Sequence, residues 1–126
     1  MKNSDYPSVL IVEDDSISIV VLKRMLADKF DIYTATNSKE AFENLNNEDF
    51  SIILMDINLG EDSMDGTSIM KHIKQSGKYG DPSIVAVTSY AMPEDRQTFL
   101  EEGFDDYLAK PVKKAELLNA IEEKLV

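Results

Sequence analysis

The stretch IILMDIN, residues 52–58, begins with four apolar residues that lead directly into an acid, Asp56. Similar short apolar runs recur along the chain at residues 9–12, 32–35, 84–87 and 107–109. Runs of this length without polar alternation are typical of strands that are buried on both faces of a parallel sheet. The pattern therefore predicts five such strands.

The segments between these runs alternate apolar and charged residues at helical spacing, the first from about Ser16 to Lys29 and the last from about Lys113 to Leu125. Asn37 and Glu40 have the spacing of a capping box at the start of the second helix, and Gly103 is expected to end the fourth as a left-handed cap. Strictly alternating strands and helices need right-handed crossovers, which place helices on both faces. The pattern predicts an α/β fold with a doubly wound five-stranded parallel sheet.

Composition limits the classes of partner. A chain of 126 residues, 43% of them hydrophobic, suits one core, and without repeats or linkers we expect residues 1–126 to form a single domain. The net charge of −11 disfavours nucleic acid and anionic membrane surfaces, and favours proteins and cations. Cysteine is absent, no apolar stretch approaches the roughly 20 residues of a membrane span, and no signal peptide is recognisable. A soluble cytoplasmic domain is expected.

Polar residues follow four of the predicted strands directly. They are Glu13, Asp14 and Asp15, then Asp56 and Asn58, then Thr88 and Ser89, and finally Lys110 and Pro111. Sites in open parallel sheets form at the carboxyl ends of the strands, so these side chains should converge. Carboxylates that share a partly buried cleft repel one another unless they take up protons or a cation neutralises them, and oxygen ligands suit Mg²⁺.

A carboxylate beside such a cation, with a lysine and a hydroxyl nearby, can act as a nucleophile toward a phosphoryl group. The resulting acyl phosphate would be held by Mg²⁺, Lys110 and Thr88. Any one of these acids alone is more often a surface charge or a helix cap, and Asp14 or Asp15 could simply cap the helix that opens near Ser16. The joint occurrence, in order, favours the functional interpretation.

The order acid pair, Asp, Thr and Lys-Pro on successive strand ends resembles the response regulator receiver family of two-component signalling, over nearly the whole chain. The resemblance implies a flavodoxin-like (βα)5 fold with strand order 2-1-3-4-5. It also implies a signalling phosphoacceptor rather than an enzyme, with intrinsic Mg²⁺-dependent self-phosphorylation and self-dephosphorylation.

Carried over position by position, the resemblance makes Asp56 the phosphoacceptor for a phosphohistidine donor. It implies that Mg²⁺ is bound by Glu13, Asp14, Asp56 and the backbone carbonyl of Asn58, with Asp15 just outside. Thr88 would bond a phosphoryl oxygen, Lys110 would pair with the phosphoryl group across a cis bond to Pro111, and Thr88 and Tyr107 would be the switch residues. Glu13 as the first acid is a permitted variant of the family.

One segment departs from the family pattern. Residues 60–64 intervene before Asp65 and Gly66, so the loop after Asp56 is about two residues longer and lacks the usual proline. The departure leaves the predicted site residues intact but bears on the backbone course near Asn58. Glu61 and Asp62 either raise the local cation affinity or are merely solvated loop acids.

Other functions fit the sequence less well. An aspartyl-phosphate hydrolase would need a second acid two residues past the nucleophile, where Asn58 stands. A flavin or nucleotide module would need a phosphate-binding loop after the first strand, where three acids stand. A phosphorylation-independent interaction domain of the same family is the main alternative, although such domains usually lose a site residue.

The expected partners are a histidine kinase or histidine phosphotransfer protein, and a downstream protein target. The first helix can bury Val21, Leu22, Met25 and Leu26, which leaves Ile17, Ile19 and Val20 as an apolar patch for docking the donor. On activation, the surface of the fourth helix, fifth strand and fifth helix would change shape. We further expect His72 to be exposed without a phosphotransfer role, and Tyr90 to shield the acyl phosphate from water. The end of the chain fits a stand-alone regulator and a piece of a longer protein equally.

Overall fold

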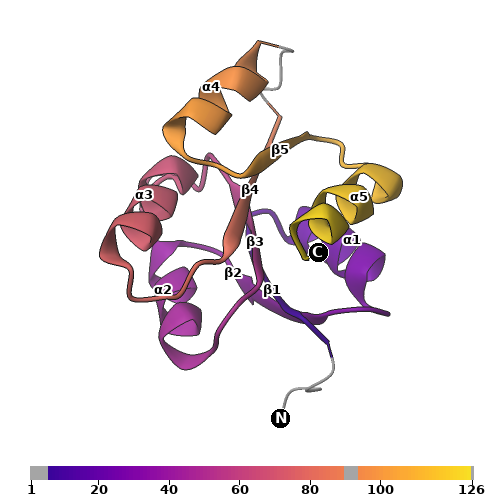
Figure 1. The fold of residues 1–126 in the computed structure, drawn as a ribbon, viewed down its shortest axis with the longest axis horizontal. Helices are drawn as coiled ribbons and strands as arrows, with labels where there is room; N and C mark the ends of the chain where they lie inside the picture. The colour runs from indigo at the N-terminus through magenta and orange to yellow at the C-terminus, as the bar shows by residue number, and fades with distance from the viewer. Residues whose placement is uncertain (1–5, 90–93, 126) are drawn as a thin grey trace.

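The computed structural model describes residues 6–89 and 94–125, which form a parallel sheet flanked by helices (Figure 1). The strands are β1 (Ser8–Val12), β2 (Asp31–Ala35), β3 (Ile52–Asp56), β4 (Ser83–Thr88) and β5 (Asp106–Ala109). The helices are α1 (Ser16–Leu26), α2 (Ser38–Asn47), α3 (Gly66–Ser76), α4 (Asp95–Glu102) and α5 (Lys114–Leu125). The strand order is β2-β1-β3-β4-β5 with every pair parallel. The flavodoxin-like α/β fold is thus confirmed.

Two apolar layers hold the helices to the sheet. The inner strands β1 and β3 are buried along their whole length, and successive residues point into opposite layers. Ile53 packs with residues of α2 and α3, whereas Leu54 packs with residues of α1 and α5. Figure 1 shows α1 and α5 on one side of the sheet and α2 and α3 on the other. This two-sided burial is the reason for the near-continuous apolar runs.

The helix ends follow local capping rules with two differences. Asn37 caps α2, and its Oδ1 accepts a hydrogen bond from the Glu40 N–H at 2.9 Å. Glu40, however, accepts from the N–H of Thr36 at 2.7 Å rather than from that of Asn37, so the capping box is displaced by one residue. Gly103 ends α4 at φ 127°, a positive angle but wider than the left-handed helical region.

Helix α1 buries less apolar surface than the sequence suggests. Leu22 and Leu26 are buried and Met25 is half-buried, as expected. Val21, however, is 42% exposed, so its predicted burial is wrong: α1 turns only one narrow stripe of side chains toward the sheet. Ile17 and Val20 are exposed, as predicted, while Ile19 is half-buried.

No helix among residues 6–89 and 94–125 has both the length and the apolar character that a membrane crossing requires. His72 lies exposed on α3, as predicted, with its ring edge-on to Phe42.

Candidate phosphoacceptor and metal site

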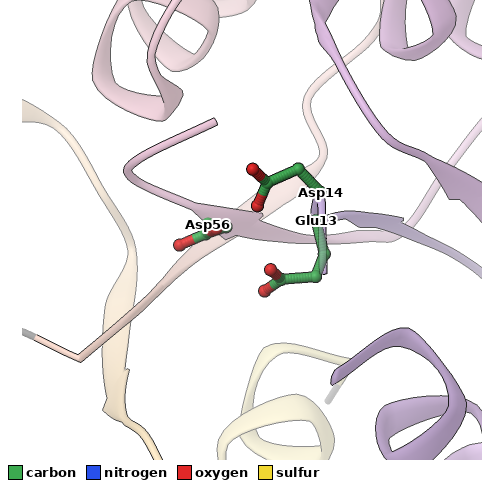
Figure 2. A group of neighbouring side chains, drawn as sticks. All are labelled: Glu13, Asp14 and Asp56. Carbon is green, nitrogen blue, oxygen red and sulfur yellow. The ribbon is translucent and has the colours of Figure 1, made fainter. Parts of the chain in front are cut away.

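Three carboxylates meet at the carboxyl edge of the sheet, where the central strands β1 and β3 end. Glu13 and Asp14 follow β1, and Asp56 is the last residue of β3. Each contributes one oxygen to a group of atoms that all lie within 4.8 Å of one another. Figure 2 shows the three side chains turned to the same side of the strand ends. Glu13 and Asp56 are buried, whereas Asp14 is exposed.

A lysine neutralises part of this charge. The Nζ of Lys110, which follows β5, lies 2.7 Å from Glu13 Oε2 and 3.7 Å from Asp56 Oδ1. Lys110 thus lies closer to the first acid of the pair than to the predicted phosphoacceptor, a preference that the sequence did not indicate. Burial lowers the pKa of Lys110, but the hydrogen bond to Glu13 and the charge of Asp56 outweigh it and raise the pKa overall.

The surroundings of Asp56 raise the pKa of its carboxyl group. Burial raises the pKa of this carboxyl group, and the negative charge of Glu13 raises it further, to about 7 despite the nearby Lys110. A nearby cation would stabilise the ionised form of Asp56, because it would offset the repulsion from Glu13.

The remaining predicted residues lie around this group. Thr88 is buried at the end of β4, and its carbonyl accepts a hydrogen bond from the Lys110 N–H at 2.9 Å. The Lys110–Pro111 bond is cis, as predicted. Tyr107 is half-buried in β5, and its ring stacks on that of Phe99 from α4 at 5.7 Å between centroids. Phe99 was not anticipated, since nothing in the sequence marks it as a partner of Tyr107. Tyr90 lies outside the described residues.

Asp15 caps α1 instead of joining the carboxylate group. Its Oδ2 accepts hydrogen bonds from the hydroxyl and the N–H of Ser18, and these bonds lower the pKa of Asp15. Of the two capping residues that the sequence allowed, Asp15 therefore does the capping and Asp14 is left beside Asp56. Asp15 is thus not part of the group formed by Glu13, Asp14 and Asp56.

The loop after Asp56 is closed at its base. The Gly66 N–H donates to the Ile57 carbonyl at 2.8 Å, and a Cβ on Gly66 would lie 2.2 Å from the Asp56 carbonyl oxygen. Only glycine therefore fits at this contact. Asn58 is exposed, and its side chain accepts from the Gly60 N–H at 3.3 Å.

These residues line an open cleft of about 540 Å³. Ser89 lines it together with the other strand-end residues, as expected, whereas Ser18 and Gly60 were not anticipated. The lining residues are Glu13, Asp14, Asp15, Ser18, Asp56, Asn58, Gly60, Thr88, Ser89 and Lys110.

The donor set fits Mg²⁺. Carboxylate oxygens are the ligands that this hard cation prefers, and ligands about 2.1 Å from one ion lie about 3 to 4 Å from one another. The 4.8 Å limit on the three carboxylate oxygens needs only a small adjustment to reach that spacing. Burial and the negative charge of Glu13 both raise the pKa of Asp56, and a nearby cation would favour its ionised form.

Comparison with known proteins agrees with this arrangement. The sequence profile of the response regulator receiver domain matches residues 9–122. An uncharacterised 14.6 kDa protein from Leptolyngbya boryana is 36% identical over 91% of this chain and 87% of its own length. The sensor histidine kinase GacS of Pseudomonas protegens is 30% identical over 94% of this chain, which spans only 13% of that kinase.

A solved structure shows the same fold. The receiver domain of the sensor histidine kinase PA1611 from Pseudomonas aeruginosa, solved with a magnesium ion coordinated in its active site cleft, has a TM-score of 0.82 and 29% identity over 95% of this chain and 98% of that one. The family match covers most of the chain and the fold agrees with it. The chain belongs to the response regulator receiver domains of two-component signalling.

Proposed function

We propose that residues 1–126 act as one receiver domain in which Asp56 accepts a phosphoryl group from a phosphohistidine donor. The observation that carries this proposal is the buried Asp56 carboxylate, held at the end of β3 with two further acids and the Lys110 ammonium around it. A surface acid would lack this neutralising environment. The proposal places the domain in the cytoplasm, because histidine kinases draw their phosphoryl group from ATP.

The transfer exchanges one bond for another. A carboxylate oxygen of Asp56 attacks the phosphorus, the phosphorus–nitrogen bond of the phosphohistidine breaks, and the freed imidazole nitrogen regains a proton from solvent. Charge on the transferring oxygens must be neutralised for this step. Lys110 supplies one positive charge, and the Thr88 hydroxyl at the end of β4 supplies a hydrogen bond to a phosphoryl oxygen.

We assign the metal ligands to Glu13, Asp14, Asp56 and the backbone carbonyl of Asn58. When bound, Mg²⁺ would neutralise the carboxylates and the oxygens of the transferred group. Lys110, which lies 2.7 Å from Glu13, would then be free to move toward the phosphoryl group, since the cation takes over the charge of Glu13. The same residues support self-phosphorylation by small phosphodonors and self-dephosphorylation.

The switch would follow from the added charge. Phosphorylation adds roughly 1.5 to 2 negative charges at Asp56, which Thr88 and Lys110 would engage. A movement of Thr88 toward the phosphoryl group would vacate space for the ring of Tyr107 to turn inward. Because that ring stacks on Phe99, its movement would change the surface of α4, β5 and α5 that a downstream protein contacts.

We assign the donor to the exposed apolar surface of α1. Ile17 is 72% exposed and Val20 47% exposed, and Ile17 lines an apolar pocket with Val21 and Pro111. The residue Ser18 borders both this pocket and the acidic cleft, so a helical donor docked on α1 would present its histidine beside Asp56. A histidine kinase or a histidine phosphotransfer protein fits this surface.

Incubation with acetyl phosphate, with and without Mg²⁺, followed by intact-mass analysis tests the proposal. We expect the wild type to gain one phosphoryl group only with Mg²⁺, and the Asp56→Asn variant to gain none. A folded wild type that gains no phosphoryl group at any Mg²⁺ concentration would instead support the alternative, an interaction domain that works without phosphorylation.

A further inference from the structure

The lengthened loop between β3 and α3 is tied to α2 by a pair of serines. The hydroxyl of Ser63 accepts a hydrogen bond from the Ser38 N–H at 2.9 Å, and the hydroxyl of Ser38 accepts one from the Met64 N–H at 3.2 Å. Ser63 also donates to the carbonyl of Met64 at 2.8 Å. We call this arrangement of Ser38, Ser63 and Met64 the serine clasp.

The serine clasp uses a donor that helix geometry leaves free. The Ser38 N–H lies in the first turn of α2, where backbone N–H groups have no partner within the helix. Asn37 already satisfies the Glu40 N–H of the same turn, so Ser63 acts as a second cap supplied from a distant loop. The contact therefore fixes the loop against an ordered helix instead of against another loop.

The same loop forms one wall of the acidic site. Asn58, whose carbonyl we assign to the metal, begins the loop, and a Cβ on Gly60 would lie 3.8 Å from Asp14 Oδ2. Gly60 has a φ of 90°, so the chain turns sharply here beside the acid. Asn58 and Gly60 of this loop therefore line the same cleft as the carboxylates.

The loop and the adjacent cleft carry charges of the same sign. Glu61 and Asp62 are exposed between Gly60 and the serine clasp, and they carry the same sign as Glu13, Asp14 and Asp56 in the adjacent cleft. At its base the loop is closed by the hydrogen bond between Gly66 and Ile57. The buried side chain of Leu59 anchors the first part of the loop in the core. Without a further attachment, repulsion and the entropy of a lengthened loop would favour positions of residues 60–64 farther from the site.

We propose that Ser38 and Ser63 are positioning residues of the metal site: the serine clasp holds the lengthened loop so that Asn58 and Gly60 stay beside the acid pair. The inference rests on the proposed function, since it assumes that the acidic site binds Mg²⁺. The serines do not touch the metal. They order the loop before the cation binds, so the entropy lost in ordering it does not reduce the affinity for Mg²⁺.

The test compares Mg²⁺ affinity across single variants of the full chain. Ser63→Ala removes the acceptor for the Ser38 N–H, Ser63→Thr keeps a hydroxyl, and Ser76→Ala is a matched control. Ser76 also bridges two backbone groups, the Ile73 carbonyl and the Lys78 N–H, but at the end of α3 away from the cleft. Dissociation constants for MgCl₂ at constant ionic strength come from NMR titration, and amide hydrogen exchange at Ser38 and Met64 is measured without metal.

We expect Ser63→Ala to speed exchange at both amides and to weaken Mg²⁺ binding about three- to tenfold, which is the loss expected for one or two hydrogen bonds. Ser63→Thr should restore the affinity and Ser76→Ala should leave it unchanged. At saturating Mg²⁺, Ser63→Ala should reach the wild-type rate of labelling by acetyl phosphate.

Two results would overturn the inference, and they are distinguishable. If the wild type binds Mg²⁺ and Ser63→Ala binds it equally well while its amides exchange faster, the serine clasp does not position the site. If the wild type itself binds no Mg²⁺, the metal assignment of the proposed function fails and this inference fails with it.

Discussion

Asp56 shows how one residue can be placed for function at a cost in stability. Its carboxyl group is buried, and burial together with the charge of Glu13 raises its pKa from 3.8 to about 7. Between pH 3.8 and about pH 7, the Asp56 carboxyl group keeps its proton in the folded state and has released it in the unfolded state. Stability therefore falls as the pH rises from about 4 to about 7, and the full penalty remains above pH 7.

Replacement of Asp56 by Asn should remove this penalty. In EDTA at pH 8 we expect Asp56→Asn to raise the free energy of unfolding by roughly 2 to 4 kcal/mol. A shift of about three pKa units corresponds to about 4 kcal/mol, and loss of the attraction to Lys110 offsets part of it. The gain should shrink at pH 5, where the wild-type carboxyl group is largely protonated. Urea unfolding at the two pH values measures both effects.

Asp81→Asn serves as the control, because Asp81 is exposed at the start of the segment that leads into β4. It should change stability little at either pH. Equal stability of Asp56→Asn and the wild type at pH 8 would show that the pocket does not strain the carboxylate.

Among the elements, β3 and α3 meet in a close backbone contact beside Asp56. Helix α3 begins at Gly66, beside the backbone of Asp56, and Asp65 caps the helix by accepting from the Ser68 N–H at 2.8 Å. The missing side chain at Gly66 lets the helix start approach the strand end. The backbone of Asp56 is therefore supported by the helix that follows it.

A methyl group at this junction should damage both stability and function. We expect Gly66→Ala to lower the free energy of unfolding by about 2 kcal/mol or more, because its Cβ would meet the Asp56 carbonyl. Displacement of that backbone should also slow labelling by acetyl phosphate. Urea unfolding and intact-mass kinetics measure the two losses.

Gly77→Ala is a suitable comparison for Gly66→Ala. Gly77 ends α3 at φ 64° with open space around its missing Cβ. This variant should cost about 1 kcal/mol from the left-handed conformation alone, with normal labelling. If the two variants were labelled equally fast at equal folded fraction, the close contact would not matter for the site.

Across the whole molecule, the apolar surface of α1 lies at the same edge of the sheet as the acidic cleft. Ile17 and Val20 project from α1, while the sheet edge carries a concentration of negative charge. A partner that docks here must combine apolar contact with tolerance of that charge. Under the proposed function, recognition of the donor and the chemistry at Asp56 would therefore depend on different residues.

That separation predicts a selective defect. We expect the double variant Ile17→Gln and Val20→Gln to fold normally and to be labelled by acetyl phosphate at the wild-type rate, because a small donor needs no docking surface. Transfer from a histidine phosphotransfer protein that phosphorylates the wild type should fall about tenfold or more. Radiolabel transfer at a limiting receiver concentration measures this rate.

Tyr6→Gln provides the matched control for that experiment. Tyr6 is 40% exposed but precedes β1, so it lies at the amino ends of the parallel strands, whereas the site lies at their carboxyl ends. Its replacement should leave transfer unchanged. Unchanged transfer in the α1 double variant would remove α1 from the donor surface.

The fold class, and the end of the sheet where the candidate site lies, could be predicted from the residue pattern alone. Strands buried on both faces must be apolar throughout, and polar residues directly after them must gather at one edge, so both features could be read from residues such as Ile53 and Asp56. Local capping at Asn37 could be read for the same reason, since it involves residues that are neighbours in the chain.

Contacts between side chains of different helices and strands could be seen only in the folded structure. The preference of Lys110 for Glu13, the stacking of Tyr107 on Phe99 and the exposure of Val21 depend on how helices and strands pack, and no spacing in the sequence encodes that packing. The bond between Ser38 and Ser63 joins residues of two elements through common, unremarkable side chains. Such contacts form only when folding brings residues that are distant in the sequence close together.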